Sequence, residues 1–183
     1  MDAKTLLLTR QSTPRLTEPA PSETQLDFIL DAGIRVPDHC GLTPWEFIIA
    51  QGDGLNKLGD IFAQAAAAND AEKVFIDKAR NMPQRAPMVI TVVAKVQKHS
   101  KVPVLEQHLA AGCATFAMQQ AAFSLGLGAV WRTGDFAFNS VVNQGLGLGE
   151  SSQIIGFLYI GTPLMTANVK PLKPGRPLRV SYS

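Results

Sequence analysis

Apolar residues recur at helical spacing in several parts of this chain and predict a series of helices. The capping-box pattern Ser22-x-x-Gln25 opens one of them, which we expect to end before Pro37. A long helix is predicted between Pro103 and Leu125, and its middle is filled with small side chains that would let another element approach closely. The other predicted helices are Asp2–Thr9, Leu55–Ala68, Ala71–Asn81 and Asn139–Leu146.

Short apolar runs between these helices predict strands. Pro87–Lys95 is rich in β-branched residues and alternates little, which is typical of a strand covered on both faces. Trp45–Ala50 and Gly128–Thr133 are further strand candidates. Ile154–Ile160 predicts a buried strand that the turn residues Gly161-Thr162-Pro163 would close.

The order of these elements predicts an α+β fold in which a central mixed β-sheet lies between helical layers. We see no repeat or linker that would divide residues 1–183, so a single domain is expected. From about residue 164 the chain should run extended across a surface. No acidic residue follows Glu150, whereas the tail carries several bases, so it could bind an anion or simply be solvated: Lys170, Lys173, Arg176 and Arg179.

Composition narrows the function classes. With 46% hydrophobic and 17% charged residues, the chain has the balance of a compact soluble protein. Its net charge of +2 is too small to indicate a nucleic-acid surface. The two cysteines, Cys40 and Cys113, form no disulfide framework. Without a signal peptide or an apolar run near the roughly 20 residues that span a bilayer, we expect a cytoplasmic protein with no membrane partner.

Several common motifs are missing. Gly-x-Gly begins at Gly52, Gly126 and Gly145, and none of these has the third glycine of a dinucleotide fingerprint. The chain contains no P-loop and no Gly-x-Ser-x-Gly elbow, and its three histidines are scattered, so neither a serine nucleophile nor a metal site is expected.

The remaining candidates are polar side chains near the ends of predicted elements. Arg10 and Arg35 each have a simpler role as a charge at a helix C-terminus, and His39 as a hydrogen bonder in a loop. Arg132 is different, because it follows a strand-like run and there needs a partner or a ligand. Since guanidinium groups suit phosphates and carbonyl-rich rings, these residues together indicate a planar anionic cofactor without identifying it.

Three segments keep a distinctive order and spacing: Arg10-Gln11-Ser12, Arg35–Phe47 and Gly126–Gly134. Together they resemble the FMN-dependent nitroreductases, and among these the small YdjA-like NAD(P)H nitroreductase subgroup. Arg80–Pro87 and Ile155–Pro163 support the likeness, which runs from the N-terminus to about Pro163.

The resemblance implies a three-layer α+β homodimer with FMN at the subunit interface and NADH or NADPH as the electron donor. It implies no essential side-chain acid or base. One subunit would contact FMN through Arg10, Gln11, Ser12, Trp131, Arg132 and Thr133, and the other through Arg35 and His39. The stretch associated with NAD(P)H corresponds to Ala121, Ala122, Phe123, Ser124, Leu125 and Gly126.

By this resemblance the protein is an oxidoreductase that reduces nitroaromatics, quinones or similar electron-poor acceptors in two half-reactions at one flavin. Two positions depart from the family: Gln11 stands where many members have a second arginine, and Thr43 stands where glutamine usually precedes Pro-Trp. Both leave the substrate preference open. The alternatives are a non-catalytic FMN-binding or sensing module, a flavin enzyme of the same fold with another acceptor, and a structural protein without a cofactor.

Overall fold

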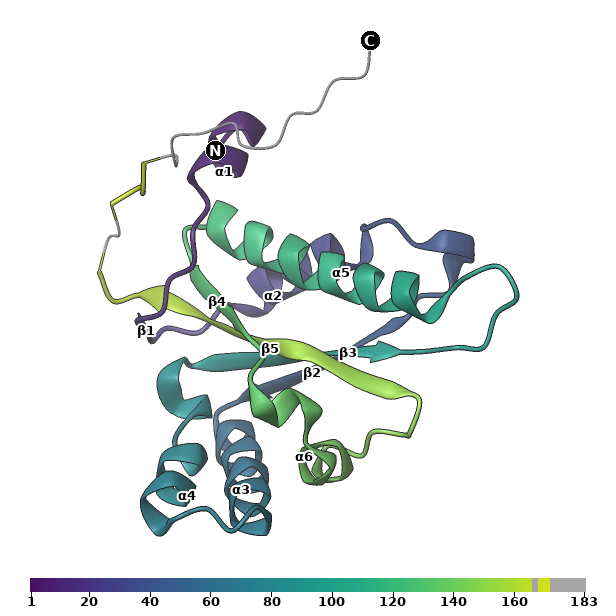
Figure 1. Ribbon diagram of the computed structural model, residues 1–183. Coiled ribbons are helices and arrows are strands. Elements are labelled where there is room, and N and C mark those ends of the chain that lie inside the picture. Colours follow the sequence, from purple (N-terminus) through teal and green to yellow (C-terminus); the bar gives the residue numbers. More distant parts are fainter. Residues whose placement is uncertain (166–167, 172–183) are drawn as a thin grey trace.

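The computed structural model describes residues 1–165 and 168–171, and in it a β-sheet lies between two layers of helices (Figure 1). This confirms the expected α+β class and its three layers. Most of the predicted basic tail, including Lys173, Arg176 and Arg179, lies outside the described residues. The five strands of the sheet are β1 (Leu16–Thr17), β2 (Trp45–Gln51), β3 (Met88–Lys95), β4 (Gly128–Arg132) and β5 (Ser152–Pro163).

The sheet runs in the order β2, β3, β5, and β5 pairs in addition with β4 and, near its C-terminal end, with β1. All pairings between the described strands are antiparallel, so the expectation of a mixed sheet was wrong. The strands β3 and β4 do run in the same direction, as a strand–helix–strand connection favours. However, β5 lies between them and runs opposite to both, and no parallel pair forms.

The strand β5 is longer than predicted. Gly161, Thr162 and Pro163 do not form a closing turn but continue it, pairing with Gly128, Thr17 and Leu16. Pro163 is tolerated because it stands at the last position of the strand, where a missing N–H costs little.

The central strand β3 is buried on both faces, as its sequence predicted. Met88, Ile90 and Val92 belong to a core cluster with the helices of one layer, whereas Val89 and Val93 belong to a second cluster on the opposite face. This alternation follows the two-residue period of a strand. The sheet therefore separates two independent hydrophobic cores.

The first helical layer contains α2 (Glu23–Ile34) and the long α5 (Val104–Ser124), with α1 (Ala3–Thr9) near the C-terminal end of α5 (Figure 1). The second layer contains α3 (Asp53–Ala68), α4 (Lys73–Arg80) and α6 (Ser140–Gly145). Short 3₁₀ turns also occur in the described part of the chain: η1 (His39–Gly41), η2 (Pro83–Arg85) and η3 (Asp135–Phe138). Among the described residues, no helix combines the length and the apolar character needed to cross a membrane.

Local signals explain most element boundaries. The capping box predicted at Ser22 is formed: its side chain accepts a hydrogen bond from the Gln25 backbone N–H, and the Gln25 side chain accepts one from the Ser22 backbone. The helix α4 begins at Lys73, two residues later than predicted, because Glu72 has the extended backbone of an N-cap residue (φ −60°, ψ 149°).

Candidate functional site

The loop that carries His39 is shaped by Asp38. One carboxylate oxygen of Asp38 accepts a hydrogen bond from the Leu42 backbone N–H (3.0 Å), and the other accepts one from the Thr43 N–H (2.7 Å). These bonds hold a tight loop in which Cys40 and Thr43 both adopt positive φ values, 64° and 45°. This anchoring role of Asp38 was not predicted from the sequence.

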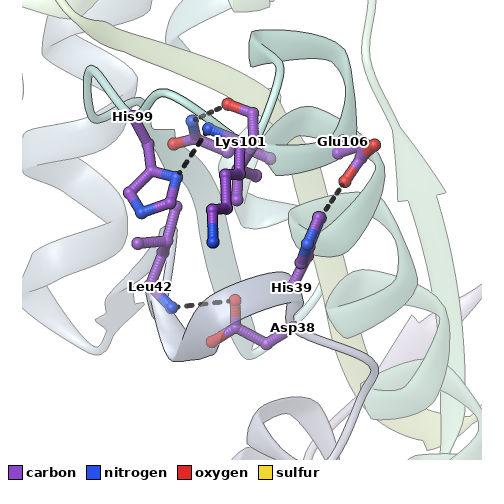
Figure 2. Close-up of polar contacts among 8 residues, drawn as sticks. Asp38, His39, Leu42, His99, Lys101 and Glu106 are labelled. Atoms are coloured by element: carbon purple, nitrogen blue, oxygen red, sulfur yellow. Dashed lines mark hydrogen bonds and ion pairs between the residues drawn. The ribbon is translucent and has the colours of Figure 1, made fainter.

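His39 leaves this loop toward the first turn of α5 and meets Glu106 there (Figure 2). The distance between His39 Nδ1 and Glu106 Oε2 is 2.7 Å, and both side chains are about half exposed. Nothing in the sequence pattern paired these residues, since 67 positions separate them. Arg35, the neighbouring candidate, is the C-cap residue of α2, and its side chain is exposed.

The side chains of Gln97 and Gln107 support the same loop through hydrogen bonds. The buried Gln107 side chain accepts a hydrogen bond from the Gln97 backbone N–H and donates one to the Gln97 carbonyl, both at 2.8 Å. The Gln97 side chain in turn donates to the Leu42 carbonyl (2.7 Å). The β3–α5 connection is thus tied both to α5 and to the loop that presents His39.

The Arg10-Gln11-Ser12 segment leaves α1 beside α5. The Arg10 guanidinium lies over the Phe116 ring, 5.4 Å from its centroid, and its Nη1 atom is buried with no hydrogen-bond partner among the described residues. The Gln11 side chain donates to the Asn168 carbonyl (3.0 Å) and accepts from the Lys170 N–H (3.3 Å). The Ser12 hydroxyl accepts a hydrogen bond from the buried Gln119 side chain (3.4 Å).

Trp131 belongs to β4, and its side chain faces α5. Its indole occupies the space that a side chain at Gly156 would need, it faces Gly112 of α5, and its N–H donates to the Ile155 carbonyl (3.3 Å). An open groove of about 540 Å³ runs along α5 at this point. We call it the α5 groove; it is lined by Val36, His108, Leu109, Gly112, Cys113, Phe116, Ala117, Gln120, Trp131 and Ile155.

The structure brings some of the candidate residues together and separates others. Trp131 lines the α5 groove, and Arg10 lies against Phe116 in its wall. Arg132 points to the opposite face of the sheet, where its Cζ atom lies 6.0 Å from the centroid of the Tyr159 ring. The hydroxyl of Thr133 donates to the same Ile155 carbonyl as Trp131 (3.4 Å). The side chains of Trp131 and Arg132 therefore cannot meet one flat ligand on the same side of β4.

The segment predicted to serve NAD(P)H ends α5. Ala121 and Ala122 are buried in the core, whereas Phe123, Ser124 and Leu125 are half-buried and Gly126 is exposed with φ 79°. Phe123 and Gly126 line a cavity of about 410 Å³ together with Gln11. Within this segment, only Phe123, Ser124 and Leu125 have side chains that could reach a ligand.

Comparison with known proteins identifies the family. The model of the "Nitroreductase family" matches residues 7–162. The chain is 45% identical over 182 residues to the Escherichia coli (strain K12) protein named "Putative NAD(P)H nitroreductase YdjA", with all of both chains covered.

Solved structures share the fold. A nitroreductase-like family protein from Bacillus cereus has a TM-score of 0.78 at 23% identity, covering 95% of this chain and 92% of that one. A nitroreductase with bound FMN from Bacteroides fragilis NCTC 9343 has a TM-score of 0.72 at 19% identity, covering 97% and 98%. The match over residues 7–162 and the 45% identity along the whole chain show that this protein belongs to the nitroreductase family.

Proposed function

We propose that this protein is an FMN-dependent oxidoreductase that uses NADH or NADPH to reduce nitroaromatics, quinones or similar electron-poor acceptors. Family membership supports the reaction class. The name of its Escherichia coli relative supports NAD(P)H as the donor, and the FMN-containing structure from Bacteroides fragilis supports the cofactor.

The observation that carries the proposal is the buried Nη1 atom of Arg10. A buried cationic N–H group without an acceptor is costly, by roughly 1–3 kcal/mol or more, so it points to a ligand that supplies one. A phosphate oxygen fits this position, because a guanidinium donates strong charge-assisted hydrogen bonds to phosphates. Gln11 and Ser12 follow directly in the chain and would add neutral contacts. The residues present therefore fit the phosphate-bearing cofactor of the family.

The α5 groove fits the apolar part of such a cofactor. It is lined mostly by apolar side chains, and Gly112 presents no side chain where α5 faces Trp131. When bound, FMN would supply the redox chemistry, accepting a hydride from NAD(P)H and passing electrons to the acceptor. In this proposal Trp131 and Ile155 exclude water and orient the ring, while Arg10 balances the negative charge. No side chain needs to act as an acid or base.

A homodimer with FMN at the subunit interface forms part of the proposal. Leu105, Leu109 and Phe116 expose large apolar side chains on α5, and a second copy of the chain would cover them. Arg35 and His39 would then approach the cofactor from the second subunit. Thr133 would contribute from the end of β4, whereas the Arg132 side chain faces the other side of the sheet and stays outside this site. Phe123 to Gly126 would lie near NAD(P)H. The cytoplasmic location also stays a prediction.

An anaerobic titration of the FMN-reconstituted protein tests this function. We expect NADH or NADPH to bleach the flavin absorbance, and a nitroaromatic compound to restore it. Bound flavin that neither donor reduces would leave a non-catalytic FMN-binding module. Reduction that only acceptors other than nitroaromatics and quinones reverse would indicate a related flavin enzyme. Protein that takes up no FMN would contradict the whole proposal.

A further inference from the structure

A second cavity lies on the other side of the sheet from the α5 groove. It has a volume of about 490 Å³, opens among α3, α4 and η3, and has β4 and β5 as its floor. We call it the aryl cavity and define it by Phe62, Phe75, Arg85, Arg132, Phe136 and Tyr159. Volumes of 300–1,000 Å³ are typical of small-molecule sites, so this cavity is large enough for an aromatic ligand.

The wall of the aryl cavity is aromatic and already ordered. The rings of Phe62 and Phe136 stack in parallel at 4.5 Å, and the edge of Phe157 meets Phe62 at 5.1 Å. Phe62 is fully buried, which fixes the position of the stack. Such a surface offers an aromatic ligand favourable stacking and edge contacts without rearrangement.

The lining of the cavity also carries cationic residues. Arg85 and Arg132 both line it, and neither forms an ion pair with a carboxylate of the described residues. Asp135 is the acidic residue among those that line the cavity, so two positive charges face one negative charge. An apolar pocket with an excess of guanidinium groups favours a ligand that is both aromatic and anionic.

Tyr159 shows that this positive charge acts inside the cavity. Burial raises the pKa of its phenol, and the nearby guanidiniums of Arg85 and Arg132 partly oppose that rise. The Arg132 guanidinium also lies 6.0 Å from the ring centroid, a cation–π distance. Arg85 and Arg132 therefore act on one point of the cavity although they come from η2 and β4.

We propose that the aryl cavity binds a small aromatic carboxylate, with its ring against the phenylalanines and its carboxylate between Arg85 and Arg132. This site goes beyond the proposed flavin reaction, and it lies on the face of β4 opposite to Trp131. Its ligand does not need to be an electron acceptor. The chemistry that recognises it is a planar aromatic ring joined to one carboxylate group.

Calorimetric titration with 2-naphthoate tests the proposal, with 2-naphthamide as the neutral analogue of the same shape. The protein is titrated both without FMN and after FMN reconstitution. We expect one naphthoate per chain, at least tenfold weaker binding of the amide, and similar naphthoate affinity in both forms. Equal binding of the amide would overturn the role of charge. Loss of naphthoate binding on FMN loading would assign the cavity to the flavin and overturn a separate site.

Variants locate the site. Arg85→Gln should weaken naphthoate binding at least tenfold, whereas Arg80→Gln should leave it unchanged, because Arg80 pairs with Asp60 outside the cavity. Phe75→Ala provides a second variant, at a side chain that is 43% exposed, and it should also weaken binding severalfold. Thermal unfolding of each variant checks its fold. Unchanged naphthoate affinity in both Arg85→Gln and Phe75→Ala would place the ligand elsewhere and end the proposal.

Discussion

His39 Nδ1 lies 2.7 Å from Glu106 Oε2, and this contact joins the loop after α2 to the first turn of α5 (Figure 2). Because about half of each side chain is exposed, solvent screens the pair, and Glu106→Gln should change the free energy of unfolding by less than about 1 kcal/mol. If His39 contacts the flavin, the same variant should release FMN severalfold faster, since the ring loses its fixed orientation. Urea unfolding and stopped-flow flavin release measure the two effects. A large stability loss with unchanged release would show a purely structural pair.

Arg10→Gln removes the buried guanidinium nitrogen that has no partner among the described residues. We expect the dissociation constant of FMN to rise at least tenfold, because a charge-assisted contact to an anion is lost. The stability of the flavin-free protein should change little or increase, since an unsatisfied buried donor disappears. Fluorescence titration with FMN measures the affinity. The exposed Arg15 supplies the matched control, Arg15→Gln, which should bind FMN like the wild type.

Gly59 lets α3 and α4 touch. A Cβ atom at this position would collide with the backbone carbonyl of Arg80, which cannot rotate away. Gly59→Ala should therefore lower the free energy of unfolding by about 1–3 kcal/mol, although alanine is the better helix former. Gly54→Ala in the same helix is the control, because its Cβ would meet only the Ala50 side chain at 3.7 Å. Equal stability of the two variants in urea would rule out the close approach.

Gln107 satisfies both backbone groups of Gln97 from a buried position. Gln107→Leu keeps the volume but leaves these groups without partners, so we expect a loss of about 1–3 kcal/mol. The exposed Gln64 on α3 gives the control Gln64→Leu, which should stay within about 0.5 kcal/mol of the wild type. Hydrogen exchange of the Gln97 amide should accelerate in Gln107→Leu alone. An unchanged exchange rate there would refute the support given to the loop.

The raised pKa of Tyr159 predicts how the free energy of unfolding changes at alkaline pH. Its pKa in the folded protein is raised above the ordinary value of 10.0, mainly by burial. The folded state then holds the phenolic proton more tightly than the unfolded state, so its contribution is complete below about pH 10 and is lost as the pH rises further. Tyr159→Phe should show a shallower loss of unfolding free energy between pH 9 and 11 than the wild type. Parallel curves for the two proteins would contradict the raised pKa.

The sequence predicted best where one local signal decides the structure. The capping box at Ser22 began α2 as expected, and the β-branched run of β3 was buried on both faces. The predictions that failed concern features that depend on residues distant in the sequence. The two-residue strand β1 exists only because it pairs with the end of β5. Because prolines flank this segment, a loop was predicted there instead of a strand. The antiparallel sheet likewise follows from β5 inserting between β3 and β4, a placement that no local pattern encodes.

The candidate site shows the same division. The resemblance supplied Arg10, Trp131 and His39, yet it could not supply Glu106 or Gln119, which contact these segments from α5 across long sequence separations. The opposite orientation of the Trp131 and Arg132 side chains could have been predicted from the sequence, because successive residues of a strand face opposite sides. The resemblance assigned the consecutive residues Trp131, Arg132 and Thr133 to one binding site, and this assignment did not take the alternation into account.

The indole of Trp131 also gives the protein a built-in optical reporter. The chain has two tryptophans, and Trp131 lies in the wall of the α5 groove while Trp45 belongs to β2. Flavins absorb where indole emits, so a flavin seated in this groove would quench Trp131 by resonance energy transfer. In a Trp45→Phe background, the emission of a single fluorophore would then follow cofactor loading and release in real time, without any added label.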